Sequence, residues 1–223
     1  MTTLAELHAV LAERHSARAF LPDPIDRATL DAIFAAAQRA PSWCNIQPWR
    51  VTITVPPETA RVSAALVAGA KSGLPRAELP YPLDYPSPYK EHRRACGHEL
   101  YTAMGIGRED KAKRYDAWLR NYEVFDAPHL AVVACDRRLG PYPFVDVGVW
   151  LGYLLAACAT AGIATCAMAS ISAYPDVLRR ELPIAETDVI LFGIALGRED
   201  TGAPANRCRT SRDPIDRNVT FVG

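Results

Sequence analysis

Apolar residues recur three and four positions apart near the start of the chain, a spacing typical of amphipathic helices. The first such segment opens at a capping box, Thr3-x-x-Glu6, and we expect its helix to end near His15. A second helix begins at Asp26, and Pro41 stops it because the residue before a proline disfavours helical geometry. The pattern therefore predicts two helices before any strand.

Further along, apolar residues alternate or run together in four short segments that predict strands. These are residues 49–55, 129–136, 164–170 and 188–197, the third being a strand or an extended loop. Helical spacing returns between them, in residues 58–72, 90–122, 146–162 and 175–182. Helices followed by a few strands predict an α+β fold with a small sheet, in a single domain over residues 1–223.

The predicted helix from Asp146, its expected N-cap, to Gly162 is apolar on nearly every face. A chain of 223 residues can hardly bury such a helix by itself, so the pattern favours a dimer with this helix at its centre. Three glycines and a threonine interrupt the run, which fits a buried helix better than a membrane span.

Composition narrows the possible partners. Lysine plus arginine and aspartate plus glutamate both number 25, so no overall charge attracts nucleic acid or an anionic membrane. The six cysteines lack metal-ligand spacing, so we expect no metal site. No signal-peptide pattern is visible, and we expect a cytoplasmic protein with reduced thiols. The strand–helix alternation and glycine motif of a dinucleotide-binding domain are missing, so a nicotinamide cofactor would bind only transiently.

A segment rich in proline interrupts the helical and strand patterns. Residues 74–89 hold five prolines, with Tyr81, Tyr85 and Tyr89 between them. Such a segment cannot form a regular element, although its tyrosines can pack. Two interpretations stay open: the tyrosines are a lid that grips an aromatic substrate, or they only pack an irregular loop.

Two clusters of arginines lie near opposite ends of the chain. In RHSAR, Arg14 and Arg18 can each direct two N–H donors at phosphate oxygens, and Ser16 adds a hydroxyl. The tail repeats this chemistry in NRCRTSR, residues 206–212. Each cluster alone is compatible with a solvated surface or with an anion site, and phosphate recognition would need the two to converge.

The segment APSWCNIQPWR, residues 40–50, places two amides in a turn between a predicted helix and a predicted strand. Asn45 and Gln47 carry both donors and acceptors, which suits the edge of a flat heterocycle. The same side chains could equally satisfy backbone groups of their own turn.

These motifs together resemble the FMN-dependent nitroreductase family, in the branch that acts on nitrobenzoate-like compounds. The resemblance rests on RHSARAF, on PSWCNIQPW about 25 residues later, and on four further segments in the same order. Those segments are FDAPHLAVV, DVGVWLGYLLAACATAGIATC, YPDVLRREL and GIALGRED. It implies a small, mostly antiparallel sheet wrapped by helices and an intertwined homodimer with shared active sites.

The resemblance also assigns residues to a bound FMN. It implies that Arg14 and Ser16 hold the phosphate, that Arg18 reaches the ring, and that the backbone of Ala167, Met168 and Ala169 runs past flavin N5. The remaining flavin-site residues that it implies are His15, Arg209 and Arg212 and, from the partner subunit, the turn residues Pro41, Ser42, Trp43, Cys44, Asn45 and Gln47.

For the reaction, the resemblance implies reduction of a nitroaromatic compound with NADH or NADPH as the transient hydride donor. Flavin N5 is then the reactive centre, and no catalytic side chain is required. Trp43 would reshape the substrate pocket, residues 74–122 would form a lid, and residues 199–223 would contact the partner. Another flavin reaction, as in reductive dehalogenases, enone or quinone reductases and flavin dehydrogenases, remains an alternative, as does a non-catalytic FMN-binding protein.

Overall fold

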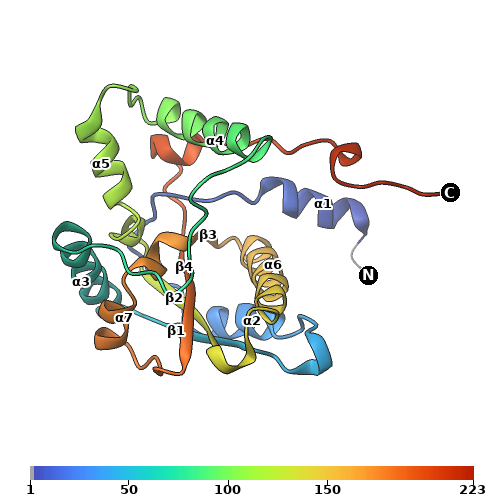
Figure 1. Ribbon diagram of the computed structural model, residues 1–223, viewed down its shortest axis with the longest axis horizontal. Helices are drawn as coiled ribbons and strands as arrows, with labels where there is room; N and C mark the ends of the chain where they lie inside the picture. The colour runs from blue at the N-terminus through green and yellow to red at the C-terminus, as the bar shows by residue number, and fades with distance from the viewer. Residues whose placement is uncertain (1–2) are drawn as a thin grey trace.

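Four antiparallel strands form the centre of the molecule in a computed structural model that describes residues 3–223 (Figure 1). Their spatial order is β1-β2-β4-β3, so β3 lies at one edge of the sheet. The strands are β1 Trp49–Ile53, β2 His129–Asp136, β3 Ala164–Met168 and β4 Asp188–Gly197. The small antiparallel sheet expected of an α+β protein is therefore confirmed.

Seven α-helices surround this sheet within the described residues (Figure 1). They are α1 Leu4–Glu13, α2 Arg27–Ala37, α3 Glu58–Ser72, α4 Tyr89–Ala103, α5 Lys111–Leu119, α6 Phe144–Thr160 and α7 Pro175–Glu181. None of these helices is long and apolar enough to cross a membrane. The capping box at Thr3 is present, and Asp26 caps α2 through the N–H of Thr29.

Three predicted boundaries were wrong. Helix α6 begins at Phe144, because Pro143 takes the N-cap position, and Asp146 lies in the first turn instead of capping it. Strand β1 ends at Ile53, two residues before its predicted end at Val55, next to the double proline. Strand β3 gives way after Met168 to a 3₁₀ segment, Ala169–Ala173.

The two faces of the sheet carry separate hydrophobic cores. In β2, Leu130 and Val132 pack on the core that includes α3, whereas Ala131 and Val133 pack on the core that includes Trp150 of α6. Every residue of β2 is buried as a result. Burial on both faces explains why this strand shows a continuous apolar run rather than an alternating one.

The 3₁₀ segment after β3 lies directly on β4. A side chain at Gly193 would place its Cβ 2.7 Å from Cγ1 of Ile171, closer than any packed contact permits. Glycine at this position therefore lets the backbone of residues 169–173 cross β4 at close range. This crossing fixes the chain immediately beyond the edge strand, where the candidate site begins.

One apolar surface is left largely uncovered by residues 3–223. No residue of α1 is buried, and Leu4 is 82% exposed although it lies on the apolar face of an amphipathic helix. In Figure 1, α1 and the C-terminal tail extend away from the sheet on the same side. A ten-residue helix is marginal in water by itself, so tertiary contacts such as those with α6 must stabilise it.

Candidate active site

The segment that contains Arg14 and Arg18 lies against the edge strand. Ser16 forms a parallel bridge with Thr165 of β3, and the N–H of Ala17 donates to the carbonyl of Thr165 at 3.0 Å. Ala17 is fully buried, so its side chain anchors the segment to the hydrophobic core. The RHSAR residues are thereby held beside β3 at its start.

The tail joins this segment through Asn206, which is 4% exposed. Its Oδ1 accepts from the N–H of Arg18 at 2.6 Å, and its Nδ2 donates to the carbonyl of Ala19 at 2.8 Å. The side chain thus forms hydrogen bonds with the backbone of two consecutive residues, Arg18 and Ala19. The N-terminal and C-terminal segments of the chain therefore meet at Asn206. This residue is also the first of the second arginine cluster, residues 206–212.

Four arginines of the two clusters have no carboxylate partner among residues 3–223. Arg18 donates to the carbonyl of Ser16 and Arg209 to the carbonyls of Asn206 and Cys208, whereas Arg212 folds back on Thr210 and Ser211. The side chain of Arg14 has neither a hydrogen bond nor an ion pair within the described chain, and with Glu199 it borders a cavity of about 210 Å³. Positive charge with spare N–H donors is the chemistry that a phosphate requires, so this donor set fits the phosphate end of FMN.

His15 has a different role from its neighbours. Its Nε2 lies 2.9 Å from Oε1 of Glu199, and its Nδ1 lies 3.1 Å from the carbonyl of Glu13. Both ring nitrogens are therefore occupied within the chain. The structure thus makes His15 an anchor between the end of α1 and the segment that follows β4.

Beyond Thr165, the edge strand presents a strip of small residues. Ala167 and Ala169 are exposed, whereas Met168 is buried in the core. The carbonyl of Thr165 faces the RHSAR segment, away from β4, and backbone groups change side at every residue of a strand. The backbone N–H and carbonyl of Ala167 consequently face outward too. A flat ring could approach this backbone closely because no large side chain covers it.

The turn before β1 is exposed and held in an uncommon conformation. Cys44, Asn45 and Gln47 have φ angles of 47°, 55° and 47°, in the left-handed region that favours glycine. The hydroxyl of Ser42 accepts from the N–H of Gln47 at 3.0 Å, and the Gln47 amide donates to the carbonyl of Asn45. Gln47 thus stabilises its own turn, which was one of the two interpretations of its sequence. Such strain persists only where the surroundings impose it, often at functional sites.

Contacts with α6 and with the residues just before it fix the orientation of this turn. The carboxylate of Asp146 accepts from the N–H of Trp43 at 3.2 Å, and the Trp43 ring packs edge-on against Tyr142 with centroids 5.2 Å apart. Trp43 remains 60% exposed. Pro41, Trp43, Cys44 and Asn45 thus lie on the surface of their own chain, where a second subunit can be reached.

Only one of the three lid tyrosines reaches the strip. The hydroxyl of Tyr81 donates to the carbonyl of Ala169 at 2.9 Å and lies 3.1 Å from the hydroxyl of Ser172. Tyr85 lies under the guanidinium of Arg93, and Tyr89 is an exposed residue of α4. The structure therefore brings Tyr81 to the candidate site, whereas Tyr85 packs within the lid.

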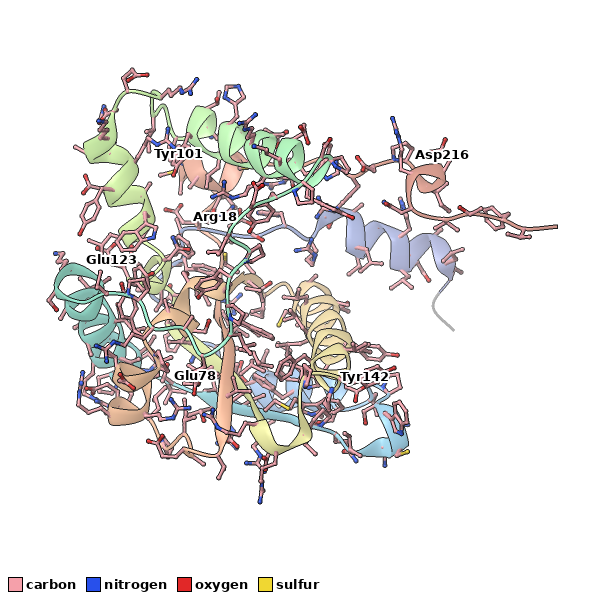
Figure 2. All side chains as sticks on the ribbon, in the orientation of Figure 1. Arg18, Glu78, Tyr101, Glu123, Tyr142 and Asp216 are labelled. Atoms are coloured by element: carbon pink, nitrogen blue, oxygen red, sulfur yellow. The ribbon has the colours of Figure 1, made fainter. Side chains whose placement is uncertain are left out.

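Sequence reasoning missed Glu78, which anchors the proline-rich segment 74–88. Its Oε1 accepts from Arg137 at 2.6 Å and from Arg179 at 3.0 Å, and its Oε2 accepts from the N–H of Ile190 at 3.0 Å. Figure 2 labels Glu78 beside β4. Burial alone would raise the pKa of this carboxyl, but the hydrogen bonds from Ile190, Arg137 and Arg179 outweigh it and lower the pKa. A lone glutamate among prolines carries no pattern that reveals such a contact.

Comparison with known proteins places the chain in a family. Residues 11–198 match the model of the nitroreductase family. The 4-nitrobenzoate reductase of Nocardioides sp. (strain LMS-CY) is 32% identical over 96% of this chain and 89% of its own length. The nitrobenzene nitroreductase of Ectopseudomonas oleovorans is 30% identical over 100% of this chain and 99% of its own. The chain belongs to the nitroreductase family.

Solved structures of other nitroreductases share the whole architecture. The FMN- and NADPH-dependent nitroreductase NfnB from Sphigopyxis sp. strain HMH is 34% identical with a TM-score of 0.93, covering 97% of this chain and 99% of that one. The FMN-dependent nitroreductase NfnB from Mycobacterium smegmatis, in complex with NADPH, is 29% identical with a TM-score of 0.95, covering 99% of this chain and 100% of that one. Residues 74–122 and the tail are therefore not additions peculiar to this nitroreductase.

Proposed function

We propose that this nitroreductase binds FMN and reduces nitroaromatic compounds, taking hydride from NADH or NADPH, as a cytoplasmic homodimer. The observation that carries the proposal is the junction at Asn206, which joins two segments whose arginines lack carboxylate partners in residues 3–223. Membership of the nitroreductase family and relatives named for nitrobenzoate and nitrobenzene reduction support the choice of reaction.

The phosphate of FMN binds at this junction in the proposal. Arg14 and the Ser16 hydroxyl approach it from the end of α1, and Arg209 and Arg212 approach it from the tail. Charge-assisted hydrogen bonds from guanidinium groups to phosphate are roughly twice as strong as neutral ones. Several such bonds would keep FMN bound throughout the reaction. A nicotinamide donor does not need them because it binds only transiently.

The ring system of FMN lies along the strip Ala167–Ala169 in the proposal. The outward N–H groups of this edge supply a hydrogen bond to the ring, and Arg18 places positive charge near its pyrimidine edge. A positive charge there stabilises negative charge that develops on the ring during reduction. Small side chains at residues 167 and 169 leave room for the ring to lie close to the backbone.

A second copy of the chain completes the site in the proposal. In the turn 41–45 all residues except the half-buried Ser42 are exposed, so they would reach the FMN of the partner subunit. Residues 199–223 would cover the exposed faces of the partner. The apolar face of α1, which residues 3–223 leave largely uncovered, supports such an association.

When FMN is bound, the chemistry that it supplies is hydride transfer from a reduced nicotinamide to the nitro group, which proceeds toward nitroso and hydroxylamine products. The protein contributes position and electrostatic stabilisation. Residues 74–122 would act as the lid, with Tyr81 hydrogen-bonded to Ala169 at its inner side. Protons can come from solvent, so no side chain is required as an acid or base.

An anaerobic reoxidation assay tests this function. Purified protein should be yellow, lose its flavin absorbance when NADH or NADPH is added, and regain it within the mixing time of a nitrobenzene or 4-nitrobenzoate solution. A halophenol and an enone serve as comparison acceptors. Faster reoxidation by either comparison compound would assign a different flavin reaction, and colourless protein that takes up no FMN would refute the proposal.

A further inference from the structure

A second pocket lies beside the proposed reactive strip. It occupies about 400 Å³ between α3, α5 and the segment that follows β3. Four aromatic rings line it, those of Tyr81, Trp118, Tyr122 and Tyr174. This volume falls within the usual range for small-molecule sites, roughly 300–1,000 Å³, and exceeds what one substituted benzene ring occupies.

The rings form a rigid floor and an open rim. Tyr122 and Tyr174 are nearly completely buried and meet edge to face, with centroids 5.3 Å apart. Trp118 meets Tyr122 in the same manner at 4.9 Å but is partly exposed, as is Tyr81. A ring that entered the pocket would therefore meet preorganised aromatic surfaces without first ordering them.

One polar group in the pocket has no partner. The hydroxyl oxygen of Ser170 is shielded from solvent and makes no hydrogen bond within residues 3–223. A shielded hydroxyl without a partner is costly, so a ligand atom that accepts its hydrogen bond would be favoured. Ser170 follows Ala169, the residue whose carbonyl contacts Tyr81.

The electrostatic character of the pocket selects the ligand. None of the residues that line it carries a charge; they are Ala70, Gly73, Pro75, Tyr81, Trp118, Tyr122, Ser170, Ala173 and Tyr174. Burial raises the pKa of the Tyr122 and Tyr174 phenols above their ordinary value, so both stay neutral near pH 7. The faces of phenol and indole rings carry negative potential and attract rings that are poor in electrons.

We propose that this pocket is a second binding site for the acceptor, specific for the uncharged, electron-poor ring of a nitroarene. On binding, the Ser170 side chain rotates about χ1 so that its hydroxyl donates to a nitro oxygen, while the ring packs against Trp118. The identity of the ligand as acceptor rests on the proposed function, whereas the existence of the site does not. The site holds an acceptor next to the strip while a nicotinamide occupies the strip itself.

The four tryptophans of the chain allow a direct test by NMR, because each indole N–H gives one resonance. Oxidised, FMN-loaded protein is titrated with nitrobenzene in the presence of excess NADP⁺ and without reductant, so no turnover occurs. We expect the Trp118 resonance to shift saturably, while those of buried Trp49 and Trp150 stay in place. A Trp118 resonance that does not move, or one whose shift NADP⁺ abolishes, would overturn the proposal.

Variants and a charged ligand complete the test. Trp118→Ala should weaken nitrobenzene binding about three- to tenfold, followed through the backbone amide of Ser170. Ser170→Ala, which removes no hydrogen bond within residues 3–223, should weaken it about threefold or more. Leu139→Ala, at an exposed position outside the pocket, is the control and should leave it unchanged. 4-Nitrobenzoate should bind at least about tenfold more weakly than nitrobenzene, because its carboxylate meets no positive group in the pocket. The site would be contradicted if both variants bound nitrobenzene as tightly as the unmodified protein and if 4-nitrobenzoate bound as tightly as nitrobenzene. Because turnover is not measured, these outcomes are independent of the reoxidation assay.

Discussion

Arg14 and Arg209 are separated by most of the sequence, yet both belong to segments that Asn206 binds together. Neither arginine has a carboxylate partner among residues 3–223, whereas Arg50, Arg61 and Arg179 all do. A guanidinium without a carboxylate partner retains positive charge that an anion can compensate. In the proposal, the phosphate of FMN compensates the charge of both arginines.

Removing these two arginines should abolish FMN retention. Each charge-assisted hydrogen bond contributes about 1.5–3 kcal/mol, so Arg14→Ala with Arg209→Ala should weaken FMN binding by about 10²–10⁴-fold. The measurement is the flavin absorbance of purified protein, followed by titration with FMN. Arg27→Ala with Arg180→Ala, which removes the same charge at exposed positions elsewhere, is the matched control. Full yellow colour in the first variant would show that the phosphate binds elsewhere.

Trp43 should control the choice of acceptor rather than cofactor affinity. It is exposed on its own chain and packs on Tyr142, so Trp43→Gly opens space while leaving the arginines proposed to bind the phosphate in place. We expect the ratio of kcat/KM values for a panel of nitroarenes to change about tenfold while the Kd for FMN stays within a factor of about three. Trp43→Phe should retain the original ranking. An unchanged ranking in Trp43→Gly would remove this residue from the pocket.

At the residue scale, the sequence predicts which side chains would bind FMN but not how the fold holds them. The arginines and the amide turn stand out because their types and spacing suit a phosphate and a heterocycle. Asn206 lies in the same motif as Arg209, but its contacts with Arg18 and Ala19 depend on a fold that joins the two chain ends. Glu78 was missed for the same reason.

At the scale of elements, the predicted boundaries held where periodicity alone sets them. Helix α3 and strands β2 and β4 have the predicted bounds, since their apolar patterns start and stop abruptly. Helix α6 starts earlier than predicted because Pro143 can cap it, a choice that depends on the preceding turn. The loop 74–88 follows no period, and its path is set by the long-range contacts of Glu78 and Tyr81.

The Glu78 anchor should hold the lid in place. Glu78→Gln replaces charge-assisted hydrogen bonds by neutral ones and should cost about 2 kcal/mol of local stability. Limited proteolysis should then cut residues 74–88 faster, and the KM for the acceptor should rise more than kcat falls. Glu58→Gln, at an exposed ion pair on α3, is the control. Equal cleavage rates for the two variants would refute the anchor.

Acid should release the same anchor. The pKa of Glu78 is lowered in the folded protein from its usual value of 4.5, so its stabilisation is fully present above pH 4.5. It is lost as the pH falls through the lowered pKa. Proteolysis with an acid-active protease should therefore accelerate within the lid below about pH 4 in the native protein and show less change in Glu78→Gln.

At the scale of the whole molecule, several surfaces agree with the proposed homodimer. The exposed apolar face of α1, the outward turn 41–47 and the projecting tail all lie outside the core of the monomer (Figure 1). The sequence indicated a dimer from the apolar helix 146–162, whose outer face, including Val149 and Tyr153, is indeed partly exposed. The sequence of one chain does not determine, by pattern alone, how two chains are arranged relative to each other.

Pairing two defective chains tests the shared site most directly. One chain carries Arg14→Ala with Arg209→Ala, and the other carries Ser42→Ala with Asn45→Ala; differently tagged copies are co-expressed and the mixed dimer is purified. Each variant alone should retain almost no FMN. If each site draws its phosphate contacts from one chain and its turn from the other, the mixed dimer regains one intact site and binds one FMN per two chains. A mixed dimer as colourless as its two parents would show that no site is shared.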